Sequence, residues 1–235
     1  MPYSRLLVGL ITLLSTATPV FAQTPVEPAS TRTARAPATH EREIWAASGA
    51  LLVASVVFDE RLRSIALANQ TPTLDHMTGG ADVLGTAGHI VPALVATYVG
   101  ARFLRKRSFA AATLRVGLSY AAADALESLL KPTVGRERPY IGGEPLTFRL
   151  LSANGDFHSF PSAHVVHISS LAAAIATEND RPWVTVLGAA AISYVGAQRV
   201  YRNQHWSSDV VASGMLGVEV ARTLNRFLRG PHAAR

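Results

Sequence analysis

The sequence predicts an all-α protein, a bundle of about six helices. Hydrophobic residues make up 49% of the 235 residues and charged residues only 16%. The apolar residues gather into long segments of helical character, separated by short stretches rich in Gly, Pro and charged residues. No segment shows the alternating pattern of a strand, and no internal repeat is visible. Segments of this kind are typical of a helical bundle.

The expected helices cover residues 44–58, 89–104, 110–130, 162–177, 183–197 and about 204–228. Charged clusters should end the first two, namely Asp59-Glu60-Arg61 and Arg105-Lys106-Arg107. A polar connection that contains Gly79-Gly80 lies between them.

The later helix ends are marked by residues that break or cap helices. Pro132, Gly135 and Pro139 should break the third helix and open a loop that runs to Phe160. Ser162 is a natural N-cap for the fourth helix, and Gly230-Pro231 lies beyond the sixth.

The ends of the chain are expected to lie outside the helical domain. Residues 1–22 have the basic start, the apolar core and the small-x-small ending of a secretory signal peptide, with an uncleaved membrane anchor as the alternative. Residues 23–43 are predicted to be a flexible linker, residues 44–228 the domain and residues 229–235 a basic tail. There is no cysteine, so the exported domain must be stabilised by packing alone.

The membrane signals conflict with one another. The charge-free runs are only about 15–17 residues, or about 23–26 Å of helix, whereas a bilayer core needs about 30 Å. A bundle with six spans would place its basic clusters inside only if it lacked a cleaved signal peptide. We therefore expect an exported protein of the periplasm or cell envelope that is membrane-associated without full spans.

The net charge of +6 suits an anionic substrate or a membrane surface. The basic residues are dispersed, without a dense tract or interleaved aromatic residues, so nucleic acid is not an expected partner.

Three short stretches concentrate the chemically active residues of this charge-poor chain. In the first, Lys131 and Arg138 flank a segment that its prolines and glycine should force out of helix, and a loop can aim both cations inward. The guanidinium of Arg138 is a planar fork that suits phosphate oxygens. A solvated basic loop is the alternative.

The second stretch is Pro161-Ser162-Ala163-His164, at a helix start. Free backbone N–H groups and the helix dipole favour an anion there. Ser162 can cap the helix or donate its hydroxyl to a ligand, and His164 can serve as a general acid.

The third stretch runs from Arg199 to Asp209. A tight connection between the fifth and sixth helices should bring Arg199 and His205 together. Asp209 follows His205 by four residues, on the same face of a helix, where a carboxylate can hold an imidazole tautomer. A nucleophilic histidine needs that help because its attacking nitrogen must be unprotonated.

Together the three stretches resemble the type-2 phosphatidic acid phosphatase family, which includes bacterial acid phosphatases and vanadium haloperoxidases. The family pattern is Lys, six residues, Arg-Pro; then Pro-Ser-Gly-His; then Ser-Arg, five residues, His, three residues, Asp. The sequence matches it from Lys131 to Asp209, except that Ala163 replaces Gly and Gln198 replaces Ser.

The resemblance implies a metal-independent phosphatase without a cofactor. Its nucleophile would be His205, which forms a phosphohistidine and is oriented by Asp209, while His164 protonates the leaving group. The phosphoryl oxygens would be bound by Lys131, Arg138, Ser162, the Ala163 amide and Arg199. The substrate would be a phosphorylated small molecule or a lipid, such as a lipid phosphate or an isoprenoid pyrophosphate.

Four alternatives remain at this point. A metal could be bound by His158, His164, His167 and His205, although the nearby cations oppose it. The protein could also be a soluble non-specific acid phosphatase, a vanadate-dependent haloperoxidase or a non-catalytic binding relative.

Overall fold

The computed structural model describes residues 39–179 and 181–229. Within these ranges the chain is helical and forms no strand, which confirms the predicted all-α bundle. Six helices have 16 residues or more: α2 (Thr39–Ala68), α5 (Ala87–Phe103), α6 (Arg107–Val134), α7 (Ala163–Glu178), α8 (Pro182–Tyr201) and α9 (Ser207–Arg229). The predicted signal peptide, most of the predicted linker and nearly all of the basic tail lie outside the described residues.

Short helices fill the connections between the long ones. The polar connection around Gly79 forms α3 (Pro72–Thr78) and α4 (Gly80–Gly85). The loop between α6 and α7 contains two 3-10 turns, η1 (Pro139–Ile141) and η2 (Gly155–Phe157).

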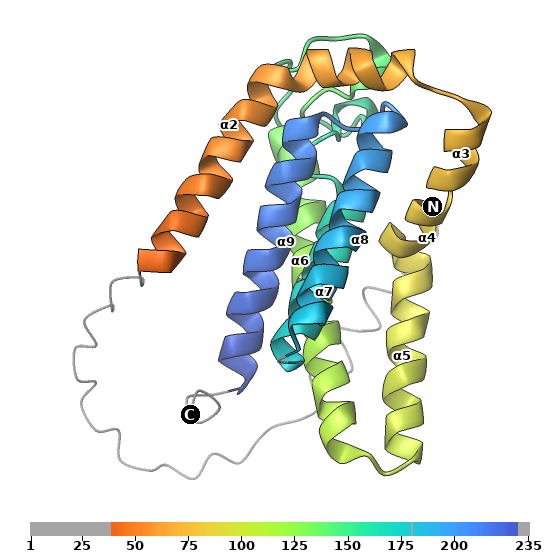
Figure 1. The fold of residues 1–235 in the computed structure, drawn as a ribbon, viewed down its shortest axis with the longest axis vertical. Coiled ribbons are helices and arrows are strands. Elements are labelled where there is room, and N and C mark those ends of the chain that lie inside the picture. Colours follow the sequence, from red (N-terminus) through yellow and green to blue (C-terminus); the bar gives the residue numbers. More distant parts are fainter. Residues whose placement is uncertain (1–38, 180, 230–235) are drawn as a thin grey trace. The chain divides into compact units, whose positions relative to one another are not determined.

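Helix α7 is central in the bundle and packs against α4, α6, α8 and α9 (Figure 1). One core cluster joins α7 to α4 and α8 through Val165, Ala81 and Val195. Gly217 of α9 allows α9 to approach α7 closely, because a Cβ atom at this position would lie 2.7 Å from the carbonyl oxygen of Val166. The small residue at this crossing lets the middle of α9 pack closely against the first two turns of α7.

Two predicted helix ends are wrong, for physical reasons. The first helix does not end at Phe58 but continues through Asp59 to Ala68, because Asp59 is buried and paired rather than solvated. The third helix continues through Pro132 and ends at Gly135, whose φ of 60° is the left-handed conformation that glycine adopts readily. Lys131 therefore lies on a helix and not in the predicted loop.

The connection between α8 and α9 also differs from the prediction. Helix α8 runs to Tyr201, so Arg199 lies in its last turn. Helix α9 begins at Ser207 and leaves His205 in the connection before it. The spacing of a regular helix therefore does not apply to His205 and Asp209.

Large apolar side chains are exposed on several helices. Val53 and Val57 of α2, Val95 and Val99 of α5 and Val186 of α8 are more than half exposed. Of the helices in the described ranges, none is by itself long and apolar enough to cross a membrane. Two consecutive helical segments, Pro72–Gly85 and Ala87–Phe103, are long and apolar enough when they are taken together. They are bent by 52° relative to each other.

Candidate active site

The three predicted stretches meet at one end of the bundle, where α6 and α8 end and α7 and α9 begin. Lys131 of α6 donates to the carbonyl oxygen of Pro161 at 2.7 Å. Arg138 donates to the carbonyl oxygen of Gln204 at 3.3 Å. His205 contacts the carbonyl oxygen of Ser159, just before α7, at 2.6 Å. Hydrogen bonds thus tie each stretch to another.

Lys131 is a largely buried cation with a fully buried partner. Its Nζ atom lies 2.6 Å from Oε1 of Glu127, one turn earlier on α6. Burial lowers the pKa of Lys131, and the neighbouring Glu127 carboxylate opposes this effect. Arg138, in the following loop, donates to the side-chain oxygen of Gln204 at 3.2 Å and to the carbonyl oxygen of Gly155 at 3.2 Å.

The start of α7 carries a hydroxyl without a partner. Ser162 occupies the N-cap position, but its hydroxyl makes no cap hydrogen bond. The Oγ atom is fully buried and has no hydrogen-bond partner among the described residues, while the backbone N–H of Ser162 donates to Ser213 Oγ at 2.7 Å. The cap hydrogen bond predicted as one role of this hydroxyl is therefore not formed, and donation to a ligand stays a prediction. Ala163 is the first residue of α7, where backbone N–H groups have no partner within the helix.

His205 has one ring nitrogen fixed by the backbone. Its Nδ1 atom lies 2.6 Å from the carbonyl oxygen of Ser159, which can only accept, so Nδ1 carries the hydrogen. In the neutral ring this leaves the lone pair on Nε2. Burial lowers the pKa of His205 from 6.5 to about 4, and the charges of Lys131 and Arg138 act in the same direction. The ring is therefore neutral at neutral pH.

Asp209 stands behind His205 and not in direct hydrogen-bond contact with it. The shortest separation, from Nδ1 to Oδ2, is 3.8 Å. Asp209 instead accepts from Arg136 at 2.6 Å, from Ser159 Oγ at 2.5 Å and from the backbone N–H of Trp206 at 3.0 Å. Burial alone would raise the pKa of Asp209, but the neighbouring His205 and Arg136 lower it. The role predicted for Asp209 is thus shared with Ser159, whose carbonyl oxygen contacts the ring.

Arg136 and Asp59 complete a buried charged network that sequence reasoning missed. Arg136 bridges Asp209 and Asp59 of α2, the latter at 2.8 Å. Asp59 in turn accepts from the backbone N–H of Ser208 at 2.8 Å and from the hydroxyls of Ser207 and Ser208. Both aspartates therefore place negative charge at the start of α9, where the helix dipole favours it. In the sequence Asp59 stands beside Glu60 and Arg61 at the end of an apolar segment, so no local signal marked it as buried.

His164 and Arg199 meet at a residue outside the three stretches, Asp82 of α4. A hydrogen-bonded ion pair joins Arg199 to Asp82, and His164 Nε2 lies 3.8 Å from Asp82 Oδ1. Burial lowers the pKa of His164 from 6.5 to about 4, with Arg199 lowering it further and Asp82 raising it. Gly85 makes room for the imidazole, because a Cβ atom there would lie 2.7 Å from it.

The predicted alternative of a four-histidine metal site is not formed by the described residues. His158 bonds to the carbonyl oxygen of Ser152 at 2.8 Å. His167 belongs to a different group, in which its Nε2 atom lies 2.6 Å from Asp124 and within 4.8 Å of a Glu127 oxygen. Its Nδ1 atom contacts the carbonyl oxygen of Gly85 at 2.9 Å. Because Glu127 is ion-paired with Lys131, we interpret this group as a polar cluster that supports the side chains of the site.

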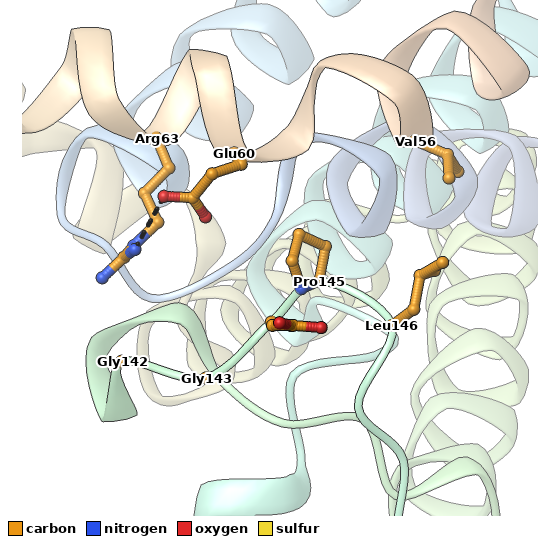
Figure 2. A pocket seen from close by; sticks show the side chains of 8 residues that line it. Val56, Glu60, Arg63, Gly142, Gly143, Pro145 and Leu146 are labelled. Atoms are coloured by element: carbon orange, nitrogen blue, oxygen red, sulfur yellow. Dashed lines mark hydrogen bonds and ion pairs between the residues drawn. The ribbon is translucent and has the colours of Figure 1, made fainter.

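A surface pocket of about 510 Å³ lies between α2 and the loop that follows η1 (Figure 2). Glu60 and Arg63 form an ion pair of 3.1 Å on its α2 side. Its lining residues are separate from the eight predicted site residues, although the carbonyl oxygen of Pro145 accepts from Arg136 at 2.8 Å. The pocket thus borders the charged network and not the side chains predicted to bind phosphate.

Comparisons with known proteins identify the family and the fold. The family model described as PAP2 superfamily matches residues 112–230, just over half of the chain. Over 65 residues the chain is 32% identical to the lipid A 1-phosphatase of Porphyromonas gingivalis, which is 27% of this chain and 15% of that protein. The chain thus covers only a small part of this curated relative.

Two crystal structures share the fold. A transmembrane PAP2 type phosphatidylglycerolphosphate phosphatase from Bacillus subtilis matches with a TM-score of 0.62 and 21% identity, over 81% of this chain and 98% of that chain. LpxE from Aquifex aeolicus matches with a TM-score of 0.51 and 18% identity, over 71% of this chain and 94% of that chain. At these identities the likeness establishes the fold.

The charged network generates a stability prediction. Replacing Arg136 with Ala leaves Asp59 and Asp209 buried and unpaired, so Arg136→Ala should lower the free energy of unfolding by about 3–5 kcal/mol. The matched control is Arg222→Ala, which removes an exposed arginine paired to Glu219 at 3.8 Å and should cost at most about 1 kcal/mol. Chemical denaturation followed by circular dichroism measures both, and equal losses would show that the network adds no stability.

Proposed function

Because the chain belongs to the PAP2 superfamily, we propose that it is a metal-independent phosphatase that hydrolyses phosphoric esters through a phosphohistidine on His205. The substrate class that we propose is a lipid phosphate or an isoprenoid pyrophosphate. The proposed site consists of His205, His164 and Asp209, with phosphate bound by Lys131, Arg138, Ser162, Ala163 and Arg199.

The observation that carries this proposal is the hydrogen bond from His205 Nδ1 to the carbonyl oxygen of Ser159. It fixes the tautomer in which Nε2 holds the lone pair, and a nucleophilic histidine requires that tautomer. Burial keeps the ring neutral by lowering its pKa to about 4. His205 thus meets both requirements of the role before any substrate binds.

The reaction follows from the charges around this nitrogen. Nε2 of His205 attacks phosphorus while the cations Lys131, Arg138 and Arg199 stabilise the charge on the phosphoryl oxygens. His164 gives a proton to the departing oxygen, and the P–O bond breaks as the P–N bond forms. Water then attacks the phosphohistidine, and its proton passes to the neutral His164.

The lipid substrate is supported by two observations. Exposed apolar side chains cover much of α2, α5 and α8, as expected for a surface that contacts lipid. The similar proteins also include a lipid A 1-phosphatase and a phosphatidylglycerolphosphate phosphatase. We propose accordingly that the protein is exported and membrane-associated.

Replacing the nucleophile tests the reaction directly. His205→Ala should reduce phosphate release to background and leave the circular dichroism spectrum unchanged, since no other described residue presents an equivalent nitrogen at this position. Brief reaction with ³²P-labelled substrate should place acid-labile label on wild-type His205. The matched control is His158→Ala, whose ring lies on the carbonyl oxygen of Ser152 and which should keep full activity. Activity in folded His205→Ala would remove this residue from its role.

A substrate panel distinguishes a lipid phosphatase from a soluble non-specific one. We expect a kcat/KM at least about tenfold higher for a long-chain phosphatidic acid or isoprenoid pyrophosphate in detergent than for para-nitrophenyl phosphate or glycerol phosphate, because one additional apolar contact is worth about 1–3 kcal/mol. Equal values across the panel would support the non-specific phosphatase. No release from any ester would support a non-catalytic relative, and halide oxidation that requires vanadate would identify a haloperoxidase.

The two histidines should give a bell-shaped pH dependence. His205 must be neutral, so activity should be lost as the pH falls through about 4. His164 must be protonated, and its pKa of about 4 places the optimum of kcat/KM at acid pH. A bound phosphate dianion favours the imidazolium form of His164, so the alkaline limb of kcat should lie at higher pH than that of kcat/KM.

A control with chelator belongs to the same measurement. The cations already supply positive charge, so EDTA should leave both profiles unchanged. Loss of activity with EDTA and its recovery with magnesium or zinc would contradict the proposed mechanism.

A further inference from the structure

Helix α4 brings to the site a carboxylate that lies outside the three motif stretches. Asp82 binds Arg199, and both of its oxygens lie 3.3 Å from Nε2 of Gln198. The side-chain oxygen of Gln198 in turn accepts from Nε of Arg199 at 2.5 Å. The glutamine that replaces the family's serine thus closes a ring of hydrogen bonds around one side of the guanidinium.

This ring leaves the other side of Arg199 available. The hydrogen bonds use Nε and Nη2 and leave Nη1 without a hydrogen bond to any described residue. Asp82 is therefore compatible with phosphate binding by Arg199.

The second contact of α4 is with His164, through Thr86. The hydroxyl of Thr86 donates to the carbonyl oxygen of Asp82 at 2.5 Å. Its single hydrogen is thus already used, so towards His164 Nε2, at 3.3 Å, Thr86 can only accept. The hydrogen of the neutral ring accordingly lies on Nε2, and Nδ1 makes no hydrogen bond to a described residue.

From this geometry we propose that Asp82 and Thr86 are positioning residues for His164, which hold its Nε2–H and leave Nδ1 as the nitrogen that exchanges protons with substrate. The inference rests on the proposed phosphatase function and deepens it. A partner that fixes one imidazole nitrogen while the other reacts is a recurring arrangement in acid–base catalysis.

The proton steps balance with Nδ1 as the reacting atom. In the first step the proton on Nδ1 passes to the leaving oxygen as the P–O bond breaks and the bond from phosphorus to His205 forms. In the second step neutral Nδ1 takes a proton from the attacking water, and the electron pair of the P–N bond returns to His205. The charge of Asp82 stabilises the imidazolium in both steps.

Several groups besides Asp82 act on the His164 charge. Arg199 from α8, His167 on α7 and His205 before α9 each disfavour the protonated ring, and burial does so most. Asp82 is the group that favours it. Removing its charge should therefore lower the pKa of His164, because the opposing groups remain.

The test compares Asp82→Asn with Asp75→Asn. Asp75 is the matched control, because it is about as exposed as Asp82 and pairs with Arg202, also near the end of α8, at 3.4 Å. The pKa of His164 is measured by NMR titration of ring-labelled protein without substrate. The pH profiles of kcat are measured with an alkyl phosphate and with para-nitrophenyl phosphate.

We expect Asp82→Asn to lower the His164 pKa and to shift the alkaline limb of kcat to lower pH. The rate on the alkyl phosphate should fall about tenfold or more, part of the roughly 10²–10⁴-fold that a general acid supplies. The rate on para-nitrophenyl phosphate should fall less, since that leaving group needs little protonation. Thr86→Val should show the same selective loss, and Thr86→Ser should restore activity.

Other results overturn the proposal in distinguishable ways. A higher KM with an unchanged His164 pKa and pH profile would mean that Asp82 acts on Arg199 alone. If Asp82→Asn and Asp75→Asn gave the same His164 pKa and the same pH profile of kcat, Asp82 would have no positioning role. A wild-type protein that releases no phosphate would refute the phosphatase function, while the NMR titration would still report whether Asp82 controls His164.

Discussion

The site depends on the buried ion pairs of Arg136. One guanidinium binds Asp59 from α2 and Asp209 from α9, and all three side chains are almost completely inaccessible to solvent. Two carboxylates buried this closely would repel each other strongly without the cation between them. Arg136 thus makes it possible for α2 and the loop after α6 to pack on the start of α9. The connection that carries His205 is held in place by this packing.

The network also explains why Asp209 does not reach His205. Its oxygens are already engaged by Arg136, by the Ser159 hydroxyl and by the backbone N–H of Trp206. The last contact, from the third residue of α9 back to the residue before it, is that of a capping box. Asp209 therefore fixes the backbone on both sides of His205 and orients Ser159, whose carbonyl oxygen holds the ring. Its effect on His205 is carried largely through this positioning.

Local patterns predicted the helices and the motif residues but not the residues that connect them. Lys131, His164 and His205 were found because short spacings place chemically active residues in a charge-poor chain. Asp59 and Asp82 could not be found in this way, because their arginine partners lie 77 and 117 residues away in the sequence. Charge alone suggested that Asp59 ends a helix, whereas burial and pairing let the helix continue. Pro132 likewise does not break α6. The helix ends only at Gly135, which adopts the left-handed conformation that terminates it.

The environments of the two histidines differ in a way that separates their roles. His205 is held at Nδ1 by a neutral carbonyl oxygen; Asp209 raises its pKa, and the charges of Lys131 and Arg138 lower it. His164 is held at Nε2 by a hydroxyl; Arg199 lowers its pKa, and Asp82 raises it. Burial is the main cause that lowers both pKa values to about 4, so the rings differ chiefly in the nitrogen that each leaves for reaction. The proposed nucleophile keeps the lone pair on Nε2, and the proposed acid keeps Nδ1 for proton exchange. This division depends on α4, an element outside the three stretches that the sequence singled out.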